Sequence, residues 1–250
     1  MDARDHIICG LDIDPDEAWG PALRLNGQIN VVKVGMRLLG PDMFRRTSII
    51  PAIIAQTRLN IMLDVGLCES STIAATACEI VRTGKERLFG FTVSCVPTMR
   101  RGLEEVVAVV REKFGEEGVS KVVAITVPTS VGMHQLDEFD IGGVTIGQVV
   151  LRWADIAYDA GIRRFVCGPR ETKSMKSAFS DIEIITTGVR FAGSGAGPHN
   201  ANRITTPAQA IEAGADYLVI DDLHTGNVRE NIARAVREIE EAWAHTATCD

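Results

Sequence analysis

The sequence lacks several features that would place it in other classes of protein. Its 250 residues carry a formal net charge of −7, which argues against a protein that binds nucleic acid mainly through positive charge. No apolar run approaches the roughly 20 residues of a membrane span. Residues 1–6 do not lead into the long apolar segment of a secretory signal. We therefore expect a cytoplasmic protein that binds neither nucleic acid nor a membrane.

Cysteine pairs with the spacing of a metal or redox site are also absent. None of the cysteines forms a C-x-x-C pair, and most lie in apolar runs. We interpret them as small buried side chains of a protein from a reducing compartment. The six are Cys9, Cys68, Cys78, Cys95, Cys167 and Cys249.

Nothing in the sequence divides the chain into domains. There is no linker rich in proline and serine and no shift in composition, and 46% of the residues are hydrophobic. The length suits one α/β barrel, which typically has about 250 residues. We predict a single domain over residues 1–250.

Short apolar runs alternate with longer amphipathic runs along the whole chain. We expect strands at 7–12, 29–35, 59–65, 87–93, 121–127, 164–167, 183–187 and 217–221. We expect helices at 15–25, 41–57, 70–83, 99–114, 146–159, 171–179, 208–213 and 228–243. Asp14 and Pro15 should begin the first helix, and Pro51 should interrupt the second.

This strict alternation predicts an α/β protein with a closed (β/α)8 barrel, the TIM barrel. An open, doubly wound sheet is the structural alternative. A dinucleotide-binding version of that sheet lacks support, because no G-x-G-x-x-G follows the first strand. Two connections are long or glycine-rich enough to be functional loops, at 128–145 and 188–203.

Polar residues at the carboxyl ends of the strands are the candidates for chemistry, since these ends form the active-site mouth of a barrel. Lys33 interrupts an otherwise apolar strand, and a buried lysine is costly unless it is paired. Its nearest partners should be Asp12 and Asp64. Such a network can hold a substrate or shift a pKa, although a purely structural ion pair would look the same.

Other acids near the strand ends are open to two interpretations. Glu69 could act in the site or only complement the dipole of the following helix. Asp222 could contact a ligand or cap the next segment. Together with Asp64 and His224 these residues could hold a divalent metal, but no spacing signature supports it. We predict no metal and no cofactor.

Several motifs resemble one known family. They are Leu11-Asp12, Val32-Lys33-Val34-Gly35, the acid at the end of the third strand, Thr187–Arg190, the 192–197 run, Thr206–Ile211 and Ala213–Tyr217. Taken together they resemble the orotidine 5'-monophosphate decarboxylase superfamily along the whole chain. The resemblance implies a homodimeric, metal-free barrel that removes carbon dioxide from a pyrimidine nucleotide.

The chain departs from that family at two positions. The family motif on the third strand is D-x-K-x-x-D, and here Asp64 and Glu69 match its acids while Gly66 stands in place of the lysine. In the family the last acid reaches across the dimer interface. The eighth strand of the family ends in Gly-Arg, whose arginine grips the substrate phosphate, and the matching residues are Asp221 and Asp222.

We therefore expect a divergent carboxy-lyase that acts on a pyrimidine nucleotide or on a related substrate without a phosphate. The predicted catalytic residues are Lys33, Asp64 and Glu69. The predicted substrate-binding residues are Asp12, Thr129, Arg190, Gly193, Arg203 and Asp222. Two alternatives remain: a metal-dependent sugar-phosphate lyase or isomerase, and a catalytically silent barrel that binds a nucleotide or nucleoside.

Overall fold

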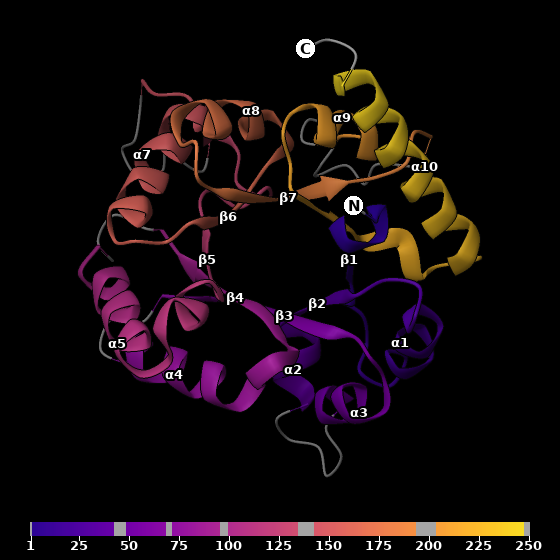
Figure 1. Cartoon of the computed structure of the whole chain (residues 1–250), viewed down its shortest axis with the longest axis horizontal. Coiled ribbons are helices and arrows are strands. Elements are labelled where there is room, and N and C mark those ends of the chain that lie inside the picture. The colour runs from indigo at the N-terminus through magenta and orange to yellow at the C-terminus, as the bar shows by residue number, and fades with distance from the viewer. Residues whose placement is uncertain are drawn as a thin grey trace.

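Eight parallel strands form a closed barrel in the order of the chain, β1 to β8 (Figure 1). The structure is a computed structural model and describes residues 2–42, 49–68, 72–95, 100–134, 143–193 and 204–247. β8 pairs with β1, with Ile7 opposite Leu218, which closes the barrel. The (β/α)8 prediction is confirmed and the open sheet is wrong. The strands are β1 (Ile7–Gly10), β2 (Val31–Gly35), β3 (Asn60–Leu67), β4 (Leu88–Ser94), β5 (Val122–Ile125), β6 (Arg164–Cys167), β7 (Glu183–Val189) and β8 (Tyr217–Ile220).

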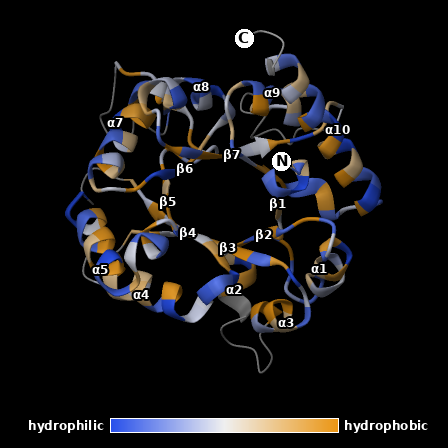
Figure 2. Ribbon diagram, viewed as in Figure 1, coloured by the Kyte–Doolittle hydropathy of each residue, from blue (hydrophilic) through white to orange (hydrophobic). Residues whose placement is uncertain are grey.

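The helices form a ring outside the strands, with hydrophilic residues mostly on their outward faces (Figure 2). They are α1 (Trp19–Leu25), α2 (Met36–Asp42), α3 (Ile49–Gln56), α4 (Ile73–Gly84), α5 (Arg100–Val119), α7 (Ile146–Asp159), α8 (Pro169–Ala178), α9 (Pro207–Glu212) and α10 (Val228–Ala247). Short 3-10 helices are η1 (Ala3–His6), η2 (Lys85–Arg87) and η4 (Asp221–His224). The last helix, α10, packs against α9 and η1, so the two ends of the chain meet.

Several helix bounds differ from the sequence prediction, and two of the differences have a clear local cause. The first helix begins at Trp19 rather than Pro15, because the Asp14 side chain accepts a hydrogen bond from Asp16 N (2.9 Å) and closes a separate turn. Pro51 lies in the first turn of α3 and does not break a helix. An N–H in the first turn has no partner within its helix, so proline costs nothing there.

Capping boxes fix the starts of α7 and α9. The Thr206 hydroxyl accepts from Gln209 N (3.2 Å), and the Gln209 side chain accepts from Thr206 N (3.2 Å). Thr145 and Gln148 form the same reciprocal pair. Each box satisfies two backbone N–H groups that a helix start would otherwise leave open.

The cysteines of the described residues are free thiols. Cys68 is exposed, whereas Cys9, Cys78, Cys95 and Cys167 are buried. Across the same residues, no helix has the length and apolarity that crossing a bilayer requires.

Alternation along the strands decides which side chains face the barrel axis. A central layer of six buried side chains fills the interior: Ile8, Val31, Met62, Val123, Ile185 and Val219. Their neighbours in sequence, such as Val32, Ile61 and Ile220, pack outward against the helices. Because side chains alternate with period two, residues 10, 33, 64 and 221 should enter the barrel one layer above, at its mouth.

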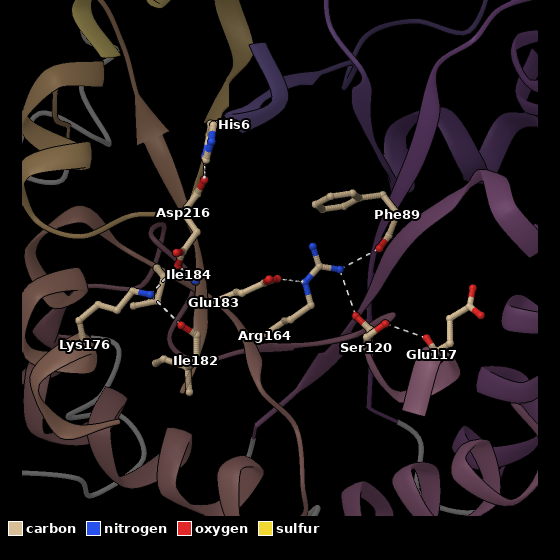
Figure 3. Close-up of polar contacts among 10 residues, drawn as sticks. All are labelled: His6, Phe89, Glu117, Ser120, Arg164, Lys176, Ile182, Glu183, Ile184 and Asp216. Atoms are coloured by element: carbon tan, nitrogen blue, oxygen red, sulfur yellow. Dashed lines mark hydrogen bonds and ion pairs between the residues drawn. The ribbon is translucent and has the colours of Figure 1, made fainter. Parts of the chain in front are cut away.

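A buried arginine closes the amino-terminal end of the barrel (Figure 3). Arg164 is 8% exposed, and its Nη1 donates to the carbonyl oxygens of Phe89 (2.9 Å) and Ser120 (3.1 Å). Its Nε lies 2.7 Å from Glu183 Oε2, and its guanidinium lies 4.2 Å from the centre of the Phe89 ring. One cation thus links β4, β6, β7 and the turn before β5.

We expect Arg164→Ala to lower the free energy of unfolding by about 2 kcal/mol, because it leaves buried carbonyl oxygens without their donor. Urea denaturation would measure the loss. Arg82→Ala is the control, since it removes only an exposed pair with Glu79 and should leave the midpoint unchanged. Equal midpoints for the two variants would contradict a stabilising role for Arg164.

Candidate active site

A cavity of about 430 Å³ opens at the carboxyl ends of the strands. Its lining includes five charged side chains, each from the end of a different strand: Asp12, Lys33, Asp64, Arg190 and Asp221. Thr129 and Thr187 add neutral hydroxyl groups. This end of a TIM barrel is where its enzymes place their active sites.

Lys33 is the only one of these charged residues that is buried, with 8% of its surface exposed. Its Nζ lies 3.1 Å from Asp64 Oδ2. Burial lowers the pKa of Lys33, but the charges of Asp64, Asp221 and Asp12 outweigh it, and the pKa lies above its ordinary value. Lys33 is therefore an ammonium ion at neutral pH, held as the sequence predicted next to Asp64.

Thr92 on β4 fixes the position of Asp64, and the predicted set of site residues did not include it. Its Oγ1 donates to Asp64 Oδ1 (3.2 Å) and accepts from Val65 N (2.9 Å) and Gly66 N (2.8 Å). These contacts use the one donor and both acceptor positions of a hydroxyl. The only signal in the sequence is a threonine near the end of an apolar strand.

Two carboxylates lie directly over glycines of the neighbouring strand. A Cβ atom on Gly10 would lie 2.1 Å from Asp221 Oδ1, and one on Gly35 would lie 3.0 Å from Asp12 Oδ1. Any side chain at residue 10 would thus displace the Asp221 carboxylate. The two glycines leave the space in which Asp12 and Asp221 reach the cavity.

Asp222, which the sequence placed at the substrate, does not line this cavity. Its Oδ2 faces Arg190 Nη1 at 3.8 Å, and the carboxylate that reaches the cavity belongs to Asp221 instead. The reason is alternation: Tyr217 and Val219 belong to the interior layer, so the next inward position is 221.

The other predicted residues divide into three groups. Asp12, Lys33, Asp64, Thr129 and Arg190 line the same cavity. Gly193 is exposed and does not line it. Glu69 and Arg203 lie outside the described residues, as does the whole 194–203 part of the predicted 188–203 loop.

A metal site gains no support from the part of the chain that the structure describes. There, no group of three or more histidine, cysteine, aspartate or glutamate side chains is placed to hold an ion. The predicted alternative paired Asp64 with Glu69, and Glu69 lies outside that part. His224 instead has its Nδ1 4.0 Å from Cys9 Sγ, beneath the rim.

Comparison with known proteins identifies the family. The model of the orotidine 5'-phosphate decarboxylase / HUMPS family matches residues 5–220. The chain belongs to this family. A protein of Heliobacterium modesticaldum named orotidine 5'-phosphate decarboxylase is 34% identical, over 98% of this chain and 99% of its own. One of the same name from Syntrophomonas wolfei is 30% identical, over 96% and 100%.

Solved structures show the same fold. The crystal structure of orotidine 5'-phosphate decarboxylase from Lactobacillus acidophilus superposes with a TM-score of 0.72, at 22% identity over 94% of this chain and 99% of that one. An uncharacterized conserved protein from Geobacillus kaustophilus also gives 0.72, at 21% identity over 93% and 99%. These structures therefore share the barrel fold over more than nine-tenths of the chain.

We expect Thr92→Val to lower the free energy of unfolding by about 2 kcal/mol, because two backbone N–H groups and Asp64 lose their partner. Thr92→Ser keeps the hydroxyl and should lose about 1 kcal/mol or less, for the missing methyl group. Urea denaturation of both variants would measure the difference. A serine variant as unstable as the valine variant would show that the methyl group, not the hydroxyl, matters.

Proposed function

We propose that this protein is a carboxy-lyase that acts on a pyrimidine nucleotide or a close nucleoside-like relative, with Lys33 as the proton donor. The observation that carries the proposal is the buried Lys33–Asp64 pair, 3.1 Å apart, in the cavity at the barrel mouth. The names of the relatives from Heliobacterium and Syntrophomonas supply the reaction class.

The proposed reaction needs one positioned proton and no cofactor. The bond between the substrate carboxylate and its ring carbon breaks, carbon dioxide leaves, and the electron pair stays on the ring carbon. The Lys33 ammonium donates a proton to that carbon, and the resulting amine regains a proton from water. A carbanion is a far stronger base than an amine, so the raised pKa of Lys33 does not prevent the transfer.

The neighbours of Lys33 have distinct roles in this proposal. Asp64 keeps the ammonium charged and in place, and Thr92 holds Asp64 through its second oxygen. An ion that is fixed before the reaction stabilises developing negative charge without reorganisation. Asp12 and Thr129, both at the cavity, would bind hydroxyl or carbonyl groups of the substrate.

Gly66 explains why Lys33 is assigned a role that another lysine has in the family. The resemblance matches Gly66 to the family lysine on the third strand, and glycine offers no proton. Lys33 is the lysine that lines the cavity among the described residues. The homodimer, and a role for Glu69 across its interface, remain predictions from the resemblance.

Replacing Lys33 tests the proposal directly. We expect Lys33→Met to lower kcat by about 10²-fold or more, because it removes the proton donor and a fixed charge. Lys33→Arg keeps a cation that does not deprotonate, so it should retain substrate binding better than turnover. The assay follows the loss of substrate absorbance at high enzyme concentration, with orotidine 5'-phosphate and with orotidine.

Lys173→Met is the matched control, since Lys173 is exposed on α8. Turnover that is equal in the Lys33 and Lys173 variants would refute Lys33 as the proton donor. If the wild-type protein binds a pyrimidine nucleoside or nucleotide but turns over neither substrate, the silent binding barrel becomes the better description.

Gly66→Lys provides a second test, by gain of activity. Gly66 has φ of +52°, so a side chain costs about 1–2 kcal/mol in backbone strain. Space is available, because the nearest atom to an added Cβ is Ile125 Cδ1 at 3.9 Å. We expect kcat on orotidine 5'-phosphate to rise about tenfold or more. Gly66→Ala has the same backbone cost without the amine and should show no gain.

A further inference from the structure

The charges around the cavity do not balance on the side of β1 and β8. Lys33 is paired with Asp64 at 3.1 Å, and Arg190 faces Asp222 at 3.8 Å. Asp12 and Asp221 remain as carboxylates at the cavity, with no hydrogen bond or close ion pair to their side chains from the described residues. Among the described residues that line the cavity, this side is therefore net negative.

We propose that Asp221 is a specificity-determining residue, which selects a substrate with a neutral hydroxyl donor on this side of the cavity and disfavours a phosphate. The inference rests on the proposed function, in which this cavity binds the substrate, and it narrows the substrate class to a nucleoside-like carboxylate without a phosphate. It assigns the selection to Asp221 rather than to Asp222.

The position of Asp221 is built into the fold. Alternation along β8 directs residue 221 inward, above Val219 and Tyr217 of the interior layer. The absent side chain of Gly10 leaves the space that Asp221 Oδ1 occupies, since a Cβ there would lie 2.1 Å away.

The surroundings of Asp221 favour a ligand that donates a hydrogen bond. Burial raises the pKa of Asp221, and Asp222 and Asp12 add to this effect, while Lys33 and Arg190 lower it. The raised pKa means that the nearby cations do not fully compensate the carboxylate. A substrate hydroxyl would supply the missing donor, whereas a phosphate dianion would add repulsion at short range.

The raised pKa of Asp221 also indicates that a neutral side chain at this position is compatible with folding. Because the folded pKa of Asp221 lies above the unfolded value, its stability contribution is greatest at low pH and is lost as the pH rises through the folded pKa. At pH 7, ionisation of Asp221 lowers the free energy of unfolding. Asp221→Asn should therefore be at least as stable as the wild type at that pH.

Isothermal titration calorimetry with uridine and with uridine 5'-monophosphate tests the selection. We expect the wild-type protein to bind uridine about tenfold or more tightly than the monophosphate, because like charges disfavour the second probe. In Asp221→Asn the affinity for the monophosphate should rise about tenfold and the affinity for uridine should not rise. Asp155→Asn, an exposed acid on α7, makes the same change in net charge and should leave the ratio as in the wild type.

Three binding results would overturn the proposal: a wild-type preference for the monophosphate, an unchanged ratio in Asp221→Asn, or no binding of either probe at millimolar concentration. The calorimetric ratio does not require turnover, so it separates this inference from the lyase proposal. If the affinity ratio is as expected but no substrate is decarboxylated, the lyase proposal is rejected and selection by Asp221 is supported. If orotidine 5'-phosphate is turned over in preference to orotidine, the lyase proposal is supported and selection against a phosphate by Asp221 is rejected.

Discussion

The structure depends on compensating one buried ammonium ion at the barrel mouth. Lys33 is 8% exposed, and an unpaired charge at that depth would cost several kcal/mol. The barrel supplies its partner from the next strand, because β3 pairs with β2 in a register that sets Gly35 opposite Asp64. The hydroxyl of Thr92 on β4 then fixes the other oxygen of Asp64. Each partner comes from one strand further along the sheet, so pairing of the strands and pairing of the charges support each other.

The buried cations at the two ends of the barrel differ in how many partners surround them. At the amino end, Arg164 is surrounded by carbonyl oxygens, Glu183 and aromatic rings, and its position leaves little for a ligand to add (Figure 3). At the mouth, and among the described residues, Lys33 has one close partner, Asp64, and the Asp12 and Asp221 carboxylates accept no hydrogen bond. Satisfied polar groups stabilise a fold, whereas groups left open in a cavity can bind something else.

The fold and half of the site could be predicted from the sequence for physical reasons. Eight alternations of apolar and amphipathic runs leave few arrangements besides a barrel, and a lysine in an apolar strand demands an acid nearby. The start of the first helix was missed because the turn made by Asp14 has no periodic signal. Thr92 is one of the polar residues at the strand ends, but the sequence assigns it no role, because its three hydrogen bonds join residues that only the barrel brings together.

The choice between Asp221 and Asp222 was available in the sequence, since the inward positions of β8 are every second residue. The Asp221 carboxylate occupies the space that a side chain at residue 10 would need, and this limits how the site can change. A side chain at residue 10 would require the Asp221 carboxylate to shift, so the two positions are coupled. A substitution at residue 10 would therefore alter the site indirectly, by moving the carboxylate at 221.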